Sequence, residues 1–313
     1  MNPNSKALGT EVSGVYRINS SANLELSTNK TISVFIPVLN EELLLPRALE
    51  SVKRIGAQVF ILDSGSTDRT LEIAESYGCI VYQGQWGSFS EKLNWGLKEL
   101  PIETEWIMRL DADEYFTDEF VEQINSGVLE RMKSDTAGIW IGRRIYFWGE
   151  WIKYGGMGAQ PNVRITRVGK AYYEVRLTDE YVLAEGEFEK LRADIIDDPA
   201  RGLSSWLNKH IGYAETECFS AYYSEKKSTW KSLQGTPRYR RFIKENIYQY
   251  IPLFIRPFVF WFYRYFILLG FLDGMRGLVY HFLHAFWYRF IIDALIFEAK
   301  LTGGSSVKKK HIM

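Results

Sequence analysis

Trp106-Ile-Met-Arg-Leu110, followed at once by Asp111-Ala-Asp-Glu114, is the stretch that decides the fold. A short apolar run that ends in polar residues predicts a buried strand. Three earlier apolar runs are each followed by a segment whose apolar residues recur at helical spacing; they cover residues 32–38, 59–62 and 79–82. Strands that alternate with short helices predict an α/β domain with a mostly parallel sheet and right-handed crossovers.

Two acidic clusters lie where predicted strands end, which is where open α/β sheets bind ligands. Asp63-Ser-Gly-Ser-Thr-Asp68 follows the second strand, and Asp111-Ala-Asp113 follows the fourth. Gly65 permits a tight turn, so that the Asp63 carboxylate is left at the strand end to accept hydrogen bonds from a base or a ribose. Asn40, after the first strand, can cap the helix that follows it.

Asp111 and Asp113 are the candidate metal ligands. Residues two apart on an extended strand end point the same way, so both carboxylates are expected to face one site. Oxygen ligands of this kind suit Mg²⁺ or Mn²⁺, which often bridge to phosphate oxygens. A solvated acidic turn is the alternative interpretation.

Composition excludes several classes of protein. The chain has 313 residues, 46% hydrophobic, which excludes a disordered or collagen-like protein. Lys+Arg and Asp+Glu both total 38, so global charge offers no attraction to nucleic acid, and no nucleic-acid partner is expected. Cys79 and Cys218 lie far apart without metal-ligand spacing. A zinc site or a disulfide framework is therefore not expected, and a reducing cytoplasm suits the chain.

Three motifs together resemble the nucleotide-sugar glycosyltransferases of family 2. They are Pro37…Asn40-Glu41, Asp63-Ser-Gly-Ser-Thr-Asp68 and Asp111-Ala-Asp113-Glu114, in the family's order and spacing over about residues 31–115. The resemblance implies a GT-A fold, with Pro37, Asn40 and Glu41 in the nucleotide-binding part, Asp63 on the base, Asp111 near the ribose or metal and Asp113 on the metal. Lys92 and Asn94 fall where related enzymes place further nucleotide contacts, although an exposed helix face explains both equally well.

The later sequence is similar to the branch of this family that builds lipopolysaccharide core and exopolysaccharide. Gly155-Gly156, Asn162-Val-Arg-Ile-Thr-Arg167 and Asp179-Glu180 carry the likeness, with Asp where the branch has a His. Either Asp179 or Glu180 is then the catalytic base. Trp206-Leu-Asn-Lys-His210 matches a further motif, so Lys209 or His210 could approach the pyrophosphate; packing between helices is the equal alternative.

Residues 251–299 form an unusual tail that holds 16 of the 48 aromatic residues. Its longest charge-free run, Gly277–Tyr288, is too short for a spanning helix, which needs about 20 mostly apolar residues. Aromatic residues mixed with Arg suit the lipid–water interface. The tail is therefore expected to be amphipathic and membrane-associated, peripheral or monotopic, on the cytoplasmic face of the inner membrane. A helical core packed on the catalytic domain is the alternative.

The expected organisation has four parts. They are an N-terminal arm (1–30), a GT-A catalytic domain (31–200, with a nucleotide-binding half, 31–115, and an acceptor half, 116–200), a helical connector (201–244), and interfacial helices with a basic tail (245–313). Residues 115–200 are expected to form short strands and loops that cover the sheet edge.

The function that the resemblance implies is inverting, metal-dependent transfer of a sugar. The donor is a nucleotide-diphosphate sugar, the metal is Mn²⁺ or Mg²⁺, and the acceptor is a lipid-linked saccharide of a bacterial surface glycan. A carboxylate would deprotonate an acceptor hydroxyl, which attacks the anomeric carbon opposite the departing nucleoside diphosphate. Two alternatives stay open: a polyprenyl-phosphate glycosyltransferase, and a non-catalytic module that binds a nucleotide sugar or a membrane.

Overall fold

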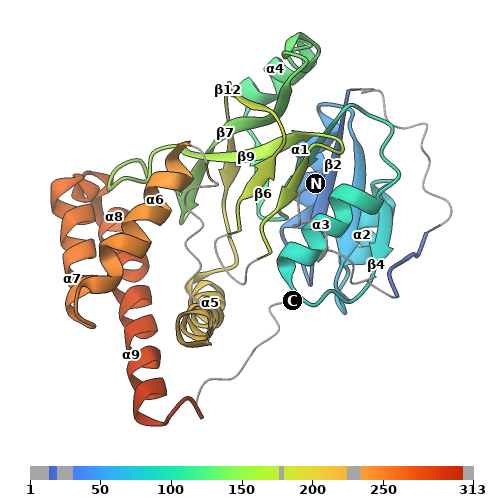
Figure 1. Ribbon diagram of the computed structural model, residues 1–313. Helices are drawn as coiled ribbons and strands as arrows, with labels where there is room; N and C mark the ends of the chain where they lie inside the picture. The colour runs from blue at the N-terminus through green and yellow to red at the C-terminus, as the bar shows by residue number, and fades with distance from the viewer. Residues whose placement is uncertain (1–13, 20–30, 176–179, 224–232, 234, 306–313) are drawn as a thin grey trace, which may run out of the picture.

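The computed structural model describes residues 14–19, 31–175, 180–223, 233 and 235–305. Its centre is one mixed β-sheet whose strands follow the order β1-β4-β3-β2-β5-β9-β7-β12-β6, with β8 paired to β7 (Figure 1). The strands are β1 (Tyr16–Arg17), β2 (Ile32–Val38), β3 (Gln58–Asp63), β4 (Ile80–Gln83), β5 (Trp106–Arg109), β6 (Glu114–Phe116), β7 (Thr136–Phe147), β8 (Glu150–Trp151), β9 (Gln160–Arg167) and β12 (Glu187–Asp197).

The first half of the sheet confirms the predicted alternation of strands and helices. Strands β4, β3, β2 and β5 are parallel neighbours. Apolar residues of β2 alternate between two cores, because successive side chains of a strand face opposite sides of the sheet. Val34 and Ile36 pack with helices α1, α2 and α4, whereas Phe35 packs with α3. These helices are α1 (Leu45–Lys53), α2 (Thr70–Ser76), α3 (Phe89–Glu99) and α4 (Asp118–Asn125).

The prediction for residues 115–200 is wrong in one respect. Instead of short covering strands, this segment contributes the long strands β7, β9 and β12 to the same sheet. β9 joins β5 antiparallel, and β7 follows antiparallel to β9, so the sheet is mixed and is mostly parallel only in its first half. A small hairpin, β10 (Ala171–Tyr173) with β11 (Val182–Ala184), stands apart from the main sheet.

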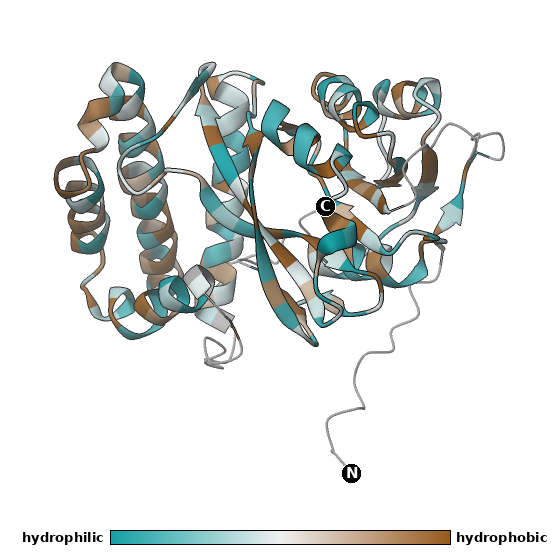
Figure 2. Cartoon of the chain, turned by 90° about the horizontal axis from the view of Figure 1, so that it is seen from above, coloured by the Kyte–Doolittle hydropathy of each residue, from teal (hydrophilic) through white to brown (hydrophobic). Residues whose placement is uncertain are grey.

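The chain ends in a helical unit that lies beside the sheet, away from α1–α3 (Figures 1 and 2). Its helix α5 packs along α9, where Ala214 contacts Tyr288 and Ile292. Tyr280 of α8 joins this unit to the end of β7 through Ile145 and Phe147. The helices are α5 (Leu203–Tyr223), α6 (Gly235–Asn246), α7 (Ile255–Phe262), α8 (Gly274–His281) and α9 (Tyr288–Leu301).

Within the described residues, no individual helix has both the length and the apolar character that crossing a bilayer requires. Ile255–Ile267 and Gly270–Leu301 meet that requirement only as a pair, with a bend of 72° between them.

Candidate functional site

The loops that follow β2 and β3 are joined into one wall at the carboxyl edge of the sheet. Asn40, with a positive φ of 55°, accepts a hydrogen bond from the Thr67 N–H at 2.8 Å and donates its own N–H to Ser66 Oγ at 2.9 Å. The Glu41 N–H donates to Thr70 Oγ1 at 2.7 Å. Asn40 therefore braces the neighbouring loop, and the prediction that it caps a helix is wrong.

Asp63 is fully buried and shapes the second loop. Its carboxylate accepts hydrogen bonds from the N–H groups of Gly65 at 2.9 Å and Ser66 at 3.0 Å, and from Gln83 Nε2 at 2.7 Å. Gly65 has φ of 98°, a conformation that glycine adopts without steric cost. The role of Asp63 on the nucleotide base stays a prediction. Pro37 is buried in β2, paired with Leu62.

Lys92 lies beneath the site and not on an exposed helix face. Its Nζ donates to the Val38 carbonyl at 3.0 Å and to Ser64 Oγ at 2.7 Å, joining the ends of β2 and β3. Burial lowers the pKa of Lys92 to about 7, although nearby carboxylates act against the shift. Asn94 exchanges hydrogen bonds with the Tyr173 backbone at 2.9 and 2.7 Å, so its amide anchors the β10–β11 hairpin to α3.

The segment Asp111–Glu114 is a turn and not an extended strand end, which corrects the geometry expected from sequence. The Asp111 carboxylate binds Arg109 through two hydrogen bonds, at 2.7 and 2.9 Å, and Arg164 at 3.0 Å. Burial alone would raise the pKa of Asp111, but these guanidinium groups outweigh it and hold that pKa well below its usual range. Asp111 is thus an ionised carboxylate held between two arginines.

The Asp113 carboxylate interacts with Lys209, a different partner from the two arginines that bind Asp111. Lys209 of α5 places its Nζ 3.3 Å from the Asp113 carboxylate, and this charge raises the pKa of Lys209 against the effect of burial. The Asp113 carbonyl accepts the Asp198 N–H at 3.0 Å. Lys209 was one of the two candidates from the Trp206–His210 motif. It does lie at the Asp111–Glu114 turn, where α5 positions it.

Arg201 completes this edge and was not predicted from the sequence. Its Nη2 donates to the Asn40 carbonyl at 2.7 Å and forms an ion pair with Glu41. Burial raises the pKa of Glu41 to about 7, against the charge of Arg201. No local motif marks Arg201, which lies 160 residues after Glu41 in the chain. Its only sequence signal is its place immediately before Gly202 and the predicted helix.

His210 takes the packing role that was the alternative in its case. Its ring stacks on Trp206 with centroids 3.5 Å apart, and its Nδ1 lies 2.8 Å from the Trp206 carbonyl. Burial lowers the pKa of His210 to about 4, so the ring is neutral at physiological pH. Tyr213 and Tyr288 pack edge-on against it.

Of the two candidate bases, Glu180 lies in the segment that connects β10 to β11. Glu180 is half-buried, and Asp179 lies outside the described residues. The hairpin is closed next to Glu180 by the Glu174 N–H, which donates to the Tyr181 carbonyl at 3.0 Å. Arg241 of α6 binds the Glu174 carboxylate through two hydrogen bonds of 2.8 Å and lies over the Tyr181 ring.

Few candidate metal ligands gather around the Asp111–Glu114 turn in the described part of the chain. Among the residues that the structure describes, no three His, Cys, Asp or Glu side chains gather into a metal-binding group. Both oxygens of Asp111 bind arginine, whereas Asp113 has the Lys209 ammonium 3.3 Å from one oxygen, Oδ2, so Asp113 is the candidate ligand for a divalent cation. One carboxylate completed by substrate phosphates and water is a usual arrangement for Mg²⁺, so the residues present fit a metal that arrives with its nucleotide.

Comparison with known proteins places these residues in context. Residues 33–181 match glycosyl transferase family 2. An uncharacterized glycosyltransferase of Rickettsia bellii is 41% identical over 101 residues, which are 32% of this chain and 33% of that protein. The chain thus spans about a third of that relative's length.

A longer match covers most of the chain. The lipopolysaccharide core biosynthesis glycosyltransferase LpsC of Rhizobium meliloti is 27% identical over 262 residues, which are 81% of this chain and 90% of that protein. Among solved structures, the mannosyltransferase PcManGT from Pyrobaculum calidifontis, in complex with GDP-Man and Mn²⁺, has a TM-score of 0.44 at 13% identity and covers 88% of each chain.

Proposed function

We propose that this chain, whose residues 33–181 form a glycosyl transferase family 2 domain with an α/β GT-A fold, is an inverting, metal-dependent glycosyltransferase. It moves a sugar from a nucleotide-diphosphate donor to a lipid-linked saccharide in the synthesis of a bacterial surface glycan of the lipopolysaccharide-core kind. The likeness to LpsC, which extends over 90% of that protein, supports the choice of glycan.

One observation carries the proposal: α5, together with Arg201 two residues before it, brings two cations to the acidic edge of the sheet, which is formed by Glu41, Asp111 and Asp113. Lys209 faces Asp113, and Arg201 faces Glu41. A nucleoside diphosphate needs positive charge around its phosphates as the sugar–phosphate bond breaks. Preorganised charges aimed at the developing negative charge are a large source of rate enhancement, because they need no reorganisation during the reaction.

Each of the site residues has a separate proposed role. Lys92 and Asp63 fix the loops that would enclose the nucleotide, and Asp111 is held ionised by Arg109 and Arg164. Asp113 would hold the divalent metal, which acts as a Lewis acid on phosphate oxygens when bound. Glu180, or its neighbour Asp179, would take the proton of the acceptor hydroxyl, a step worth ~10²–10⁴ in rate.

The lipid-linked acceptor and the membrane location rest on the C-terminal helices. Between Phe254 and Met275 the charged residues are Arg256, Arg264 and Asp273, and none of them is exposed. Arg256 is paired with Asp293, Arg264 donates to the Gly155 carbonyl, and Asp273 accepts two backbone N–H groups.

The outward side of the same segment is apolar, with hydrophobic residues along the helices (Figure 2). Its exposed large hydrophobic side chains include Ile255, Phe258, Phe262, Ile267, Leu272 and Met275. A contiguous exposed apolar patch marks an interaction surface. Because these three charged residues are turned away from solvent while the apolar side chains are exposed, we propose that this side enters the cytoplasmic leaflet of the membrane without crossing it.

The test compares two single substitutions in a transfer assay with labelled nucleotide sugars and membrane glycolipids. Glu180→Gln should keep nucleotide binding but lose about 10²–10⁴-fold in turnover to a hydroxyl acceptor, because an amide does not accept the proton. Asp179→Asn should stay close to wild type. If Asp179→Asn is the inactive variant, the base is Asp179.

Full activity of both variants would contradict base-assisted transfer. A phosphate acceptor is already ionised and needs no base, so that result would favour a polyprenyl-phosphate glycosyltransferase. If the wild-type protein turns over no nucleotide sugar, the remaining interpretation is a non-catalytic module that binds a nucleotide sugar or a membrane.

A further inference from the structure

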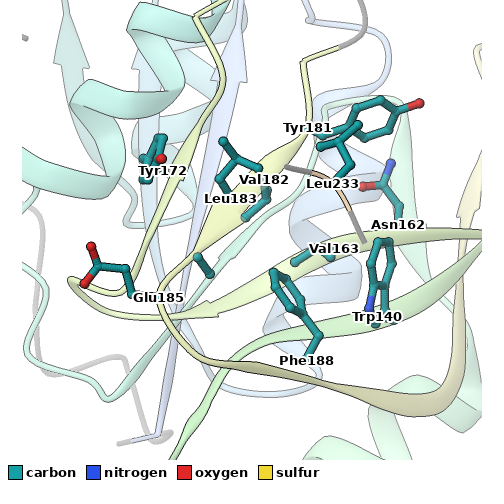
Figure 3. A pocket seen from close by; sticks show the side chains of 11 residues that line it. Trp140, Asn162, Val163, Tyr172, Tyr181, Val182, Leu183, Glu185, Phe188 and Leu233 are labelled. Carbon is teal, nitrogen blue, oxygen red and sulfur yellow. The ribbon is translucent and has the colours of Figure 1, made fainter. Parts of the chain in front are cut away.

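A cavity of about 180 Å³ lies between the β10–β11 hairpin and the sheet. Trp140 of β7, Asn162 of β9 and Phe188 of β12 line it from the sheet, and Tyr172 and Tyr181 line it from the hairpin side (Figure 3). The Trp140 and Phe188 rings are 5.8 Å apart and tilted, so they form a continuous aromatic wall.

The lining suits a saccharide ring. A pyranose presents C–H groups on its faces and hydroxyl groups around its rim, so it is bound by aromatic surfaces together with a few polar groups. Here aromatic rings supply the walls, and the Asn162 amide supplies both a donor and an acceptor. The volume is well below the roughly 300–1,000 Å³ of pockets for drug-sized ligands, so the cavity takes a group of about one ring.

A β-bulge connects this cavity to the acidic edge. Ile139 pairs with Ile165, but the next residue, Trp140, pairs with Val163, which leaves Arg164 extra on β9. Val163 lines the cavity, and the adjacent Arg164 binds Asp111 and Glu114 at the proposed donor site, so one strand connects the two.

The candidate base is equally close in the chain. Tyr181, which lines the cavity, directly follows Glu180. Arg241 holds this end of the hairpin by its ion pair with the buried Glu174 and by its position 4.8 Å from the Tyr181 ring centroid. The cavity thus has a wall, Tyr181, that is adjacent in sequence to the candidate base and is held in place by Arg241.

We propose that this cavity is a saccharide subsite that holds one sugar ring of the acceptor glycan. The inference rests on the proposed function for its biological meaning. Its chemical content is that Trp140, Phe188 and Asn162 bind a neutral sugar ring independently of the nucleotide.

The experiment measures saccharide binding directly, so that it requires no turnover. Free glucose, galactose, mannose and N-acetylglucosamine at millimolar concentration are titrated into the full-length protein in detergent, with saturation-transfer NMR as the readout. At least one sugar should bind, and a saturating nucleoside diphosphate with Mn²⁺ should not displace it. Trp140→Leu and Asn162→Leu should each weaken its binding about tenfold or more.

Two variants serve as controls. Trp140→Phe keeps an aromatic wall and should retain most of the binding, and Tyr16→Ala removes an exposed tyrosine on β1, at the far end of the sheet. Unchanged binding in both Leu variants, displacement by the nucleotide, or no binding of any sugar would each overturn the subsite. A protein that binds sugar here but transfers none would contradict the proposed function and leave the subsite standing.

Discussion

At the scale of single residues, four polar side chains connect the acidic edge of the sheet to other parts of the chain. Lys92, Asn94, Asp111 and Lys209 all lie at or beneath the predicted edge of the sheet. Their contacts were not predictable, because each depends on a partner elsewhere in the chain: Asn94 bonds to Tyr173, 79 residues later. Sequence spacing predicts on which face of a helix or strand a residue lies. It does not predict which other element packs against that face.

Lys92 gives a prediction about pH. Burial lowers its pKa from the ordinary 10.5 to about 7. Between these values the unfolded chain binds one more proton than the folded chain, so the free energy of unfolding should rise with pH in this window, by at most about 1.4 kcal/mol per unit. Lys92→Met, neutral in both states, should lack that contribution.

The measurement is urea unfolding in detergent at pH 7, 8 and 9. Wild type should gain stability relative to Lys92→Met as the pH rises. Lys98→Met, which changes a surface residue of the same helix, should follow wild type. A wild-type advantage that does not change with pH would mean that Lys92 keeps its proton in the folded state.

At the scale of elements, the strand–helix alternation of residues 31–110 could be predicted because each strand is a short apolar run between helical patterns. Helix α5 falls within the segment 201–244, which the sequence predicted to be a helical connector. The strands β7, β9 and β12 were missed as parts of the main sheet. Their polar positions, such as Arg143, Arg144 and Arg164, interrupt the apolar pattern, and they are stabilised by carboxylates from neighbouring elements.

A buried ion pair joins the start of α7 to α9. Asp293 is 1% exposed and accepts hydrogen bonds from Arg256 Nε at 2.7 Å and from the Phe254 N–H at 2.8 Å. Asp293→Ala would leave the Arg256 guanidinium buried without its counter-charge, at a cost of about 3–5 kcal/mol. The double change Arg256→Leu/Asp293→Leu removes both charges and should recover most of that loss.

Thermal unfolding in detergent compares these variants. Lys300→Ala, an exposed change on α9, is the matched control and should leave the melting temperature unchanged. If Asp293→Ala melts with the control, or the double variant is no better than the single one, the pair does not hold α7 in place.

At the scale of the whole molecule, the structure sets a catalytic-type α/β domain beside a helical unit with an apolar outer side (Figures 1 and 2). The sequence indicated the aromatic tail, but it could not show that Arg256, Arg264 and Asp273 face inward, since their partners come from α9, from the loop after β8 and from backbone groups. These three residues bond within the fold, whereas Arg276, the next charged residue along the chain, is exposed.

The membrane proposal gives a fractionation experiment. Cell membranes are washed with high salt and then with detergent; the protein should resist salt and leave with detergent, and a protease outside the cytoplasm should cut no residue. Phe262→Glu/Ile267→Glu places two charges on the apolar side and should move the protein to the soluble fraction. Leu43→Glu, an exposed change in the α/β domain, should not. Release of wild type by salt alone would mean that the tail is packed core.

The central claim is that the acidic edge binds a nucleoside diphosphate through a metal held by Asp113. Its most direct test is the thermal stabilisation of the purified protein by UDP and GDP, each with and without Mn²⁺. Wild type and Asp118→Ala, a surface change on α4, should be stabilised by one nucleotide with Mn²⁺, by about 2.7 kcal/mol at 100 times the dissociation constant. Folded Asp113→Ala should show no Mn²⁺-dependent stabilisation; if it is stabilised as wild type is, the claim is wrong.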